Sequence, residues 1–145
     1  PALAARLARF NRASLFGCSQ FIQDAAAFAL RNDDIYVERM RLEYLARREL
    51  IVGALAAMPG LRCEAPDAGM FVMLDVRGTG LDGIRFAEGL FAATGVSTVP
   101  GIGFGGTTRD YVRISLAQDQ ATLRRALDRI GRWTAGLMER ATASS

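Results

Sequence analysis

The sequence predicts a fold of the α/β class: a small α+β domain whose mixed or antiparallel sheet is covered by helices on one face. Three observations lead to this prediction. Four short apolar stretches with strand character lie in the second half, helical apolar spacing recurs between and after them, and residues 1–33 contain no strand candidate. We therefore expect a boundary near Asp34, with residues 1–33 forming the incomplete helical end of one domain and residues 34–145 forming a C-terminal domain.

The first 33 residues are expected to form two helices. Apolar side chains on one side of residues 2–10 predict the end of a helix, and residues 11–17 are expected to form a loop. Ser19 can cap a second helix that runs to about Leu30. This segment has no strand to pack on, so its apolar side chains need a partner elsewhere.

A long helix is expected to follow, from Ile35 to about Met58. Polar residues 32–34 form a break and a good N-cap before it, and Pro59–Gly60 ends it. At ~1.5 Å per residue, such a helix would exceed about 30 Å. That length is enough for an interdomain helix that precedes the small domain.

The sequence after Gly60 predicts elements in the order β-β-α-β-β-α. Its strand candidates are short and largely apolar or alternating, and its helix candidates carry apolar residues at helical spacing. Strands are expected at residues 61–64, 70–75, 96–99 and 111–116, and helices at residues 82–94 and 119–138. The tail of residues 141–145 is expected to fray.

The composition excludes several kinds of chemistry. All eighteen cationic residues are arginine, so the chain offers no lysine nucleophile, no histidine general base and no histidine-containing metal site. The net charge is +3 and the arginines are interleaved with acids, unlike the one-sided basic surface of a nucleic-acid-binding protein. No apolar run reaches the ~20 residues that cross a bilayer. Cys18 and Cys63 follow no metal or redox spacing, and we expect two reduced, mostly buried thiols.

The most informative side chain is Arg113, in the alternating run YVRISLA. Tyr111, Arg113 and Ser115 share one face of the expected strand, because successive side chains point to opposite faces. Placing an arginine in an otherwise apolar sheet costs free energy unless an anion accepts hydrogen bonds from the N–H groups of its planar guanidinium. A carboxylate accepts two parallel hydrogen bonds from these groups. The alternative is a structural pair with Asp75 or Glu88. The pattern alone does not choose between these two interpretations.

Two further features border this strand. The glycine-rich run PGIGFGG, residues 100–106, either brings the backbone close to a ligand or forms a simple turn. No helix follows it, so a phosphate site at a helix N-terminus is not supported. Phe71, at the start of the 70–75 strand, either walls a pocket or belongs to an ordinary core.

Four segments, in order, resemble the C-terminal third of the class I/II aminotransferases of fold type I. SQFIQDAAAFAL resembles the family's S-x-x-x-Q-x-A-x-x-A-L helix after the cofactor lysine, and AGMFVMLDV resembles its G-x-F strand. GVSTVPGIGFG resembles G-V-x-V-x-P-G-x-x-F-G, and YVRISLA resembles the strand bearing the arginine that binds the substrate α-carboxylate. The likeness covers about residues 1–138. Within the family, FIQDAA and GMFVMLDVRGTGL resemble arginine–pyruvate transaminases.

The resemblance implies roles for individual residues. Arg113 would bind the α-carboxylate of amino-acid and 2-oxo-acid substrates, and Phe71 would lie near the substrate at the mouth of the site. Gly103 and Phe104 would belong to a site-lining loop near the domain interface. Residues 12–18 would lie near the site of a partner subunit in a cytoplasmic homodimer.

The resemblance also implies what the chain lacks. The family binds pyridoxal 5'-phosphate through a lysine, and this chain has none. Residues 1–33 would be the end of the large cofactor domain, and residues 34–145 the small domain. We therefore expect a C-terminal fragment that supplies the substrate-binding arginine, contains no catalytic residue, and is inactive alone.

A second interpretation comes from a different class of function. The chain could be a stand-alone β-β-α-β-β-α regulatory module that binds a small metabolite through its glycine-rich loop. This interpretation requires residues 1–33 to pack on the same core as the sheet. No cofactor-binding residue can be named under either interpretation, and neither calls for a metal site.

Overall fold

The computed structural model describes residues 2–15 and 17–143, which divide into two compact units at residues 1–40 and 41–145. The first unit contains α1 (Ala2–Leu15), α2 (Gln20–Asn32) and the start of α3 (Asp34–Ala56). None of the described residues of α1 or α2 is buried. These two helices therefore have no core of their own.

The loop expected at residues 11–17 is wrong over most of its length, because α1 continues to Leu15. Nothing in residues 11–15 breaks a helix, and the Arg12 Nε–H donates back to the Ala8 carbonyl oxygen at 3.3 Å. The break comes at Gly17, whose φ of +80° suits glycine. Residue 16 lies outside the described residues.

A four-stranded antiparallel sheet forms the centre of the second unit, in the order β1-β2-β4-β3. Its bounds are β1 (Arg62–Cys63), β2 (Phe71–Asp75), β3 (Val99–Pro100) and β4 (Tyr111–Ser115). Met73 of β2 and Val99 of β3 flank Arg113 of β4. Arg113 is thus on a central strand, with a neighbouring strand on each side.

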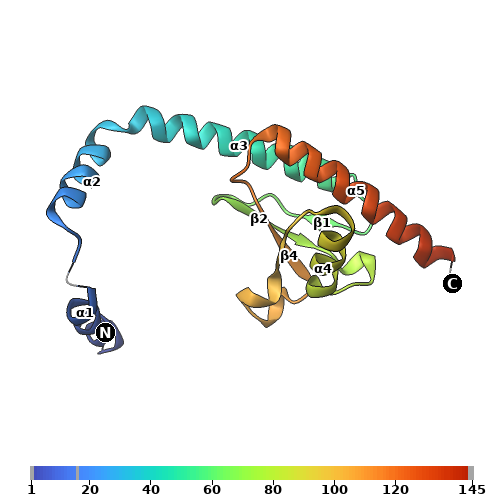
Figure 1. The fold of residues 1–145 in the computed structure, drawn as a ribbon, viewed down its shortest axis with the longest axis horizontal. Helices are drawn as coiled ribbons and strands as arrows, with labels where there is room; N and C mark the ends of the chain where they lie inside the picture. Colours follow the sequence, from blue (N-terminus) through green and yellow to red (C-terminus); the bar gives the residue numbers. More distant parts are fainter. Residues whose placement is uncertain (1, 16, 144–145) are drawn as a thin grey trace. The chain divides into compact units, whose positions relative to one another are not determined.

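Helices cover one face of this sheet, as the sequence predicts (Figure 1). They are the end of α3, α4 (Gly83–Thr94) and α5 (Gln120–Ala143). The short 3₁₀ turn η1 (Arg77–Thr79) lies between β2 and α4, and η2 (Gly101–Phe104) and η3 (Gly106–Thr108) lie between β3 and β4. Val72, Leu74 and Val112 point from the sheet toward these helices and are fully buried. The helices contribute buried Ile51, Leu55, Phe86, Leu90, Leu123, Leu127 and Ile130 to the same core.

Local sequence signals determine where α4 begins and ends. The Asp82 carboxylate accepts a hydrogen bond from the Arg85 backbone N–H at 2.9 Å, which caps the helix as expected. Gly95 ends it in the left-handed conformation, at φ 72°. The chain then turns, and the Val96 N–H donates to the Thr94 hydroxyl oxygen. Pairing with β4 therefore begins only at Val99, and the expected strand at residues 96–99 is displaced toward Pro100.

The C-terminal helix runs further than expected. α5 begins next to the expected residue 119 but continues to Ala143 rather than ending near residue 138. The Thr142 hydroxyl lies 2.8 Å from the Glu139 carbonyl oxygen, so its side chain is satisfied within the helix. Residues 141–143 of the tail are helical, and residues 144–145 lie outside the described residues.

Candidate functional site

The face of the sheet opposite the helices carries the polar side chains. Period-2 alternation places Phe71, Met73 and Asp75 of β2 on it, beside Tyr111 and Arg113 of β4. Phe71 is 42% exposed, whereas its neighbour Val72 is fully buried. This open face is where the chain can meet a ligand.

Arg113 lies against two aromatic rings on this face. Its guanidinium carbon is 5.2 Å from the centre of the Phe71 ring and 4.9 Å from the centre of the Phe104 ring. Both distances fall within the range of a cation–π contact, about 6 Å. The structure therefore brings together three of the four site residues expected from the sequence, and Gly103 directly precedes Phe104 on the same turn.

The structural pairings considered for Arg113 are wrong. Among the residues that the structure describes, no carboxylate forms an ion pair with Arg113. Asp75 pairs with Arg77 instead, and Glu88 belongs to α4, on the other side of the sheet.

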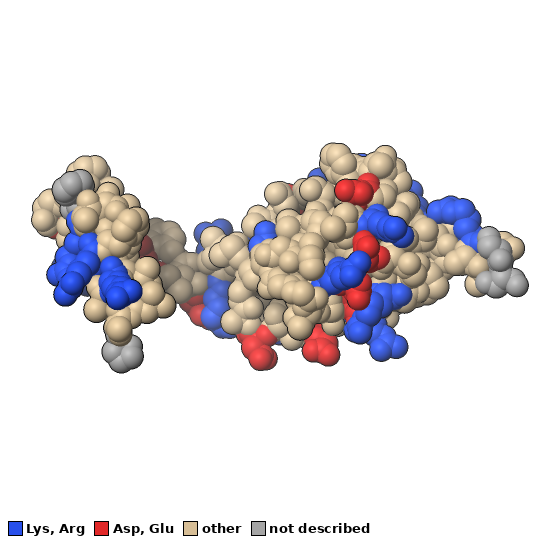
Figure 2. Space-filling model, turned by 90° about the horizontal axis from the view of Figure 1, so that it is seen from below, with Lys and Arg blue, Asp and Glu red and all other residues tan. Residues whose placement is uncertain are grey.

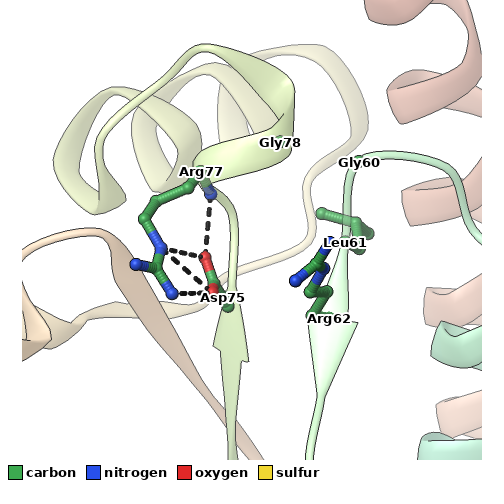
Figure 3. A pocket seen from close by; sticks show the side chains of 6 residues that line it. All are labelled: Gly60, Leu61, Arg62, Asp75, Arg77 and Gly78. Atoms are coloured by element: carbon green, nitrogen blue, oxygen red, sulfur yellow. Dashed lines mark hydrogen bonds and ion pairs between the residues drawn. The ribbon is translucent and has the colours of Figure 1, made fainter.

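A second cluster on the open face lies at the other end of β2 (Figure 3). The Arg77 Nε–H lies 3.0 Å from both carboxylate oxygens of Asp75. The Arg77 Nη2 group also contacts Asp75 Oδ2, and the Arg77 backbone N–H donates to Asp75 Oδ1. These hydrogen bonds hold the pKa of Asp75 below its ordinary value, against the effect of burial. The Arg77 guanidinium carbon also lies 5.7 Å from the Tyr111 ring centre. The sequence analysis missed this cluster, because only the η1 turn folds Arg77 back over Asp75.

A hollow of about 500 Å³ lies beside this second cluster, lined by Gly60, Leu61, Arg62, Asp75, Arg77 and Gly78. It does not include Arg113. The Asp75 and Arg77 charges in its wall already satisfy each other. Its third charged residue, Arg62, has no aromatic ring against its guanidinium among the contacts of the described residues. Arg113 is the better candidate for a ligand-binding residue because its guanidinium has no acidic partner among the described residues.

The glycine-rich loop has an internal structural role. The Thr108 hydroxyl lies 2.7 Å from the Gly101 carbonyl oxygen and 2.8 Å from the Gly105 carbonyl oxygen. A Cβ on Gly101 would come within 2.2 Å of the Thr108 carbonyl oxygen. The loop is thus a braced pair of 3₁₀ turns that carries Phe104 to Arg113.

The remaining candidates for chemistry are few. Cys18 is exposed, contrary to the expectation of a buried thiol, and Cys63 is half-buried, where burial and then the Glu64 charge raise the pKa of its thiol. Within residues 2–15 and 17–143, no three ligating side chains are grouped as a metal site would need. Nor does any helix in these residues combine the length and apolarity of a membrane span. On the face shown in Figure 2, cationic and acidic side chains are intermixed over the larger unit.

The fold is an α+β domain, and its open sheet face carries one arginine that lies against two aromatic rings. The family model for aminotransferase class I and II matches residues 1–130. The chain belongs to this family.

Several relatives show how much of such a protein the chain represents. It is 41% identical over 140 residues to the arginine–pyruvate transaminase AruH of Pseudomonas aeruginosa, covering 97% of this chain and 36% of that protein. It is 36% identical to an aspartate aminotransferase of Pyrococcus horikoshii, over 77% of this chain and 29% of that protein. The chain therefore spans about a third of the length of the relatives it matches.

The fold is also similar to that of a solved aminotransferase structure. The aromatic aminotransferase of Pyrococcus horikoshii superimposes with a TM-score of 0.84 at 35% identity, over 94% of this chain and 36% of that one. The resemblance on which the sequence analysis relied is confirmed, together with its α/β fold class.

The residues of this chain do not fit the family's way of holding its cofactor. Class I/II aminotransferases hold pyridoxal phosphate through a lysine, and no position in the 145 residues is a lysine. The residues of this chain therefore cannot supply the covalent link to that cofactor.

Proposed function

We propose that the chain is the C-terminal part of a pyridoxal-phosphate-dependent aminotransferase, which transfers an amino group from an L-amino acid to a 2-oxo acid. Arg113 binds the α-carboxylate of both substrates. The observation that carries this proposal is a guanidinium on the open sheet face with aromatic rings at 4.9 and 5.2 Å and no acidic partner among the described residues.

The chemistry of the two substrates supports this role. An amino acid and the 2-oxo acid derived from it share only their α-carboxylate as a fixed anionic group. A planar fork that donates two parallel hydrogen bonds fixes the orientation of that carboxylate as well as its affinity. Phe71 then lies at the edge of the substrate site, and Gly103 and Phe104 form the turn that closes its other side.

The exposed apolar surface of the first unit supports the proposed domain division. Many large apolar side chains of residues 1–40 are exposed, among them Leu3, Leu7, Phe10, Leu15, Phe21, Phe28, Leu30 and Ile35. A water-exposed surface of this composition needs a partner. We assign residues 1–33 to the end of the large cofactor domain and residues 34–145 to the small domain, so that the remainder of that large domain is the partner.

The proposal leaves this chain inactive when alone, because the cofactor lysine must come from outside it. The complete protein is expected to be a cytoplasmic homodimer, as the family resemblance implies, with residues 12–18 near the partner subunit's site. The 41% identity to an arginine–pyruvate transaminase favours a donor with a basic side chain and pyruvate as acceptor.

A hybrid enzyme tests the proposal. Residues 1–145 replace the matching segment of the Pseudomonas aeruginosa relative, which retains its own cofactor-binding part. We expect the hybrid to convert L-arginine and pyruvate, while the 145-residue chain with added pyridoxal phosphate shows no turnover. A hybrid that folds and binds the cofactor but does not transaminate would contradict the proposal.

A further inference from the structure

We infer that Phe104 is a positioning residue: its ring, together with that of Phe71, lies against the Arg113 guanidinium and leaves its N–H donors free for a carboxylate. The inference rests on the proposed function for the identity of that carboxylate. It assigns to the glycine-rich turn the task of presenting an aromatic face to an arginine.

The first ring comes from the neighbouring strand. Phe71 pairs with Ser115, and Arg113 pairs with Met73, so Phe71 and Arg113 are diagonal neighbours on the same face of the sheet. Diagonal neighbours lie about 7 Å apart, within reach of long side chains. The 5.2 Å contact shows that the Arg113 side chain extends along β4 toward the Phe71 end of the sheet.

The second ring comes from the other side of β4. Phe104 ends η2, which follows β3, and β3 pairs with β4 on the edge away from β2. Its 4.9 Å contact is the shorter of the two. Arg113 is therefore held by rings that reach it from both of its neighbouring strands.

Hydrogen bonds and close packing fix the backbone of the turn that contains Phe104. The Thr108 hydroxyl bonds the carbonyl oxygens of Gly101 and Gly105, on both sides of Phe104. Gly101 packs so closely on β4 that an added Cβ would lie 2.7 Å from the Tyr111 carbonyl oxygen. The ring thus projects from a backbone whose path is fixed at both ends.

Aromatic contact differs in its consequence from an ion pair. Arg47 and Arg77 each pair with a carboxylate, Glu43 and Asp75, which occupies N–H donors. A phenyl ring stacks on the flat face of a guanidinium and accepts none of its in-plane hydrogen bonds in return. Phe71 and Phe104 therefore restrict the conformation of the Arg113 side chain, while its guanidinium N–H groups stay available to a carboxylate.

Nuclear magnetic resonance of the 145-residue chain, with ¹⁵N-labelled arginine, tests this role. The Arg113 Nε–H resonance is assigned from the Arg113→Leu variant, and pyruvate is the titrated probe. We expect Phe104→Leu to move this resonance, because a ring current is lost, and to weaken pyruvate binding by roughly two- to five-fold. Phe104→Tyr keeps the aromatic face and should restore both values.

The matched control is Phe91→Leu, which removes a 58% exposed ring on α4, compared with 52% for Phe104. It should change neither the resonance nor the affinity. An unchanged Arg113 resonance and unchanged pyruvate affinity in Phe104→Leu would overturn the inference. If Arg113→Leu binds pyruvate as well as the unsubstituted chain does, the proposed function fails instead, and the Phe104→Leu resonance still decides the positioning role.

Discussion

At the scale of single residues, two arginines of the open sheet face differ in what surrounds their guanidinium groups. Arg77 folds back on Asp75, and its charge is neutralised within its own turn. Arg113 meets only aromatic rings among the described residues. The first arrangement stabilises the end of β2, and the second leaves the Arg113 charge without an acidic partner among the described residues.

The Asp75–Arg77 pair makes a prediction about pH. Hydrogen bonds from Arg77 lower the pKa of Asp75 below its usual 3.8. A lowered pKa in the folded state adds stability above the unfolded-state pKa, and this stability is lost as pH falls through the folded-state pKa. We expect urea denaturation at pH 2 to 6 to show this loss, and Asp75→Asn to flatten it. An equally steep pH dependence in Asp75→Asn would show that other carboxylates cause it.

The sequence names Arg113, Phe71 and Phe104 as candidates, but it does not predict how the two rings reach Arg113. The alternation in YVRISLA fixes which side chains share a face, because strand geometry has a period of two. The contact with Phe104 depends on the path of two 3₁₀ turns, and the Asp75 partner depends on the turn after β2. Neither path follows from local residue preferences, so the sequence left open a pair between Arg113 and Asp75, which the structure does not form.

At the scale of elements, the glycines of the 101–106 turn have unequal tasks. Gly101 approaches β4 closely, whereas an added Cβ on Gly103 would meet no atom within 4 Å. The turn therefore depends on the first glycine for packing and leaves the second open to the solvent side.

This difference gives a paired prediction. Gly101→Ala should lower the free energy of unfolding by roughly 1–3 kcal/mol, because the methyl group overlaps the Thr108 carbonyl oxygen at 2.2 Å. Gly103→Ala in the same turn should change it by less than about 0.5 kcal/mol. Urea denaturation of both variants provides the comparison. Equal effects of the two substitutions would contradict the packing described for Gly101.

Local signals predicted elements well where caps and breakers mark their ends. The helix expected at residues 82–94 is confirmed as α4, whose ends are set locally by the Asp82 side-chain cap and by Gly95 in the left-handed conformation. The strand at residues 96–99 was displaced, since pairing with β4 decides where β3 begins. The order β1-β2-β4-β3 likewise arises from contacts between distant segments, which periodicity does not encode.

At the scale of the whole molecule, the two units differ in how much they bury. The second unit contains the core shared by α3, α4, α5 and the sheet, while α1 and α2 have no buried residue among those described. The stand-alone regulatory module instead requires the first 33 residues to share this core.

Limited proteolysis checks this division. Trypsin cleaves after arginine, and residues 1–40 offer sites at Arg6, Arg9, Arg12, Arg31 and Arg39. Cleavage there should be at least about tenfold faster than cleavage within residues 41–145, because segments without buried contacts open locally at little cost. Mass spectrometry should find a persistent fragment beginning after residue 31. Uniform resistance along the chain would instead support a single packed module.

The most direct measurement is kcat/KM for pyruvate in the hybrid enzyme, with Arg113→Leu compared with Arg85→Leu. Arg85 is an exposed arginine of α4, on the helical side of the domain, so its loss should leave kcat/KM within about twofold. Loss of a fork that binds the carboxylate should lower kcat/KM by roughly a hundredfold, or about 3 kcal/mol of transition-state binding. An Arg113→Leu hybrid with the same kcat/KM as the Arg85→Leu control would contradict the assignment of Arg113.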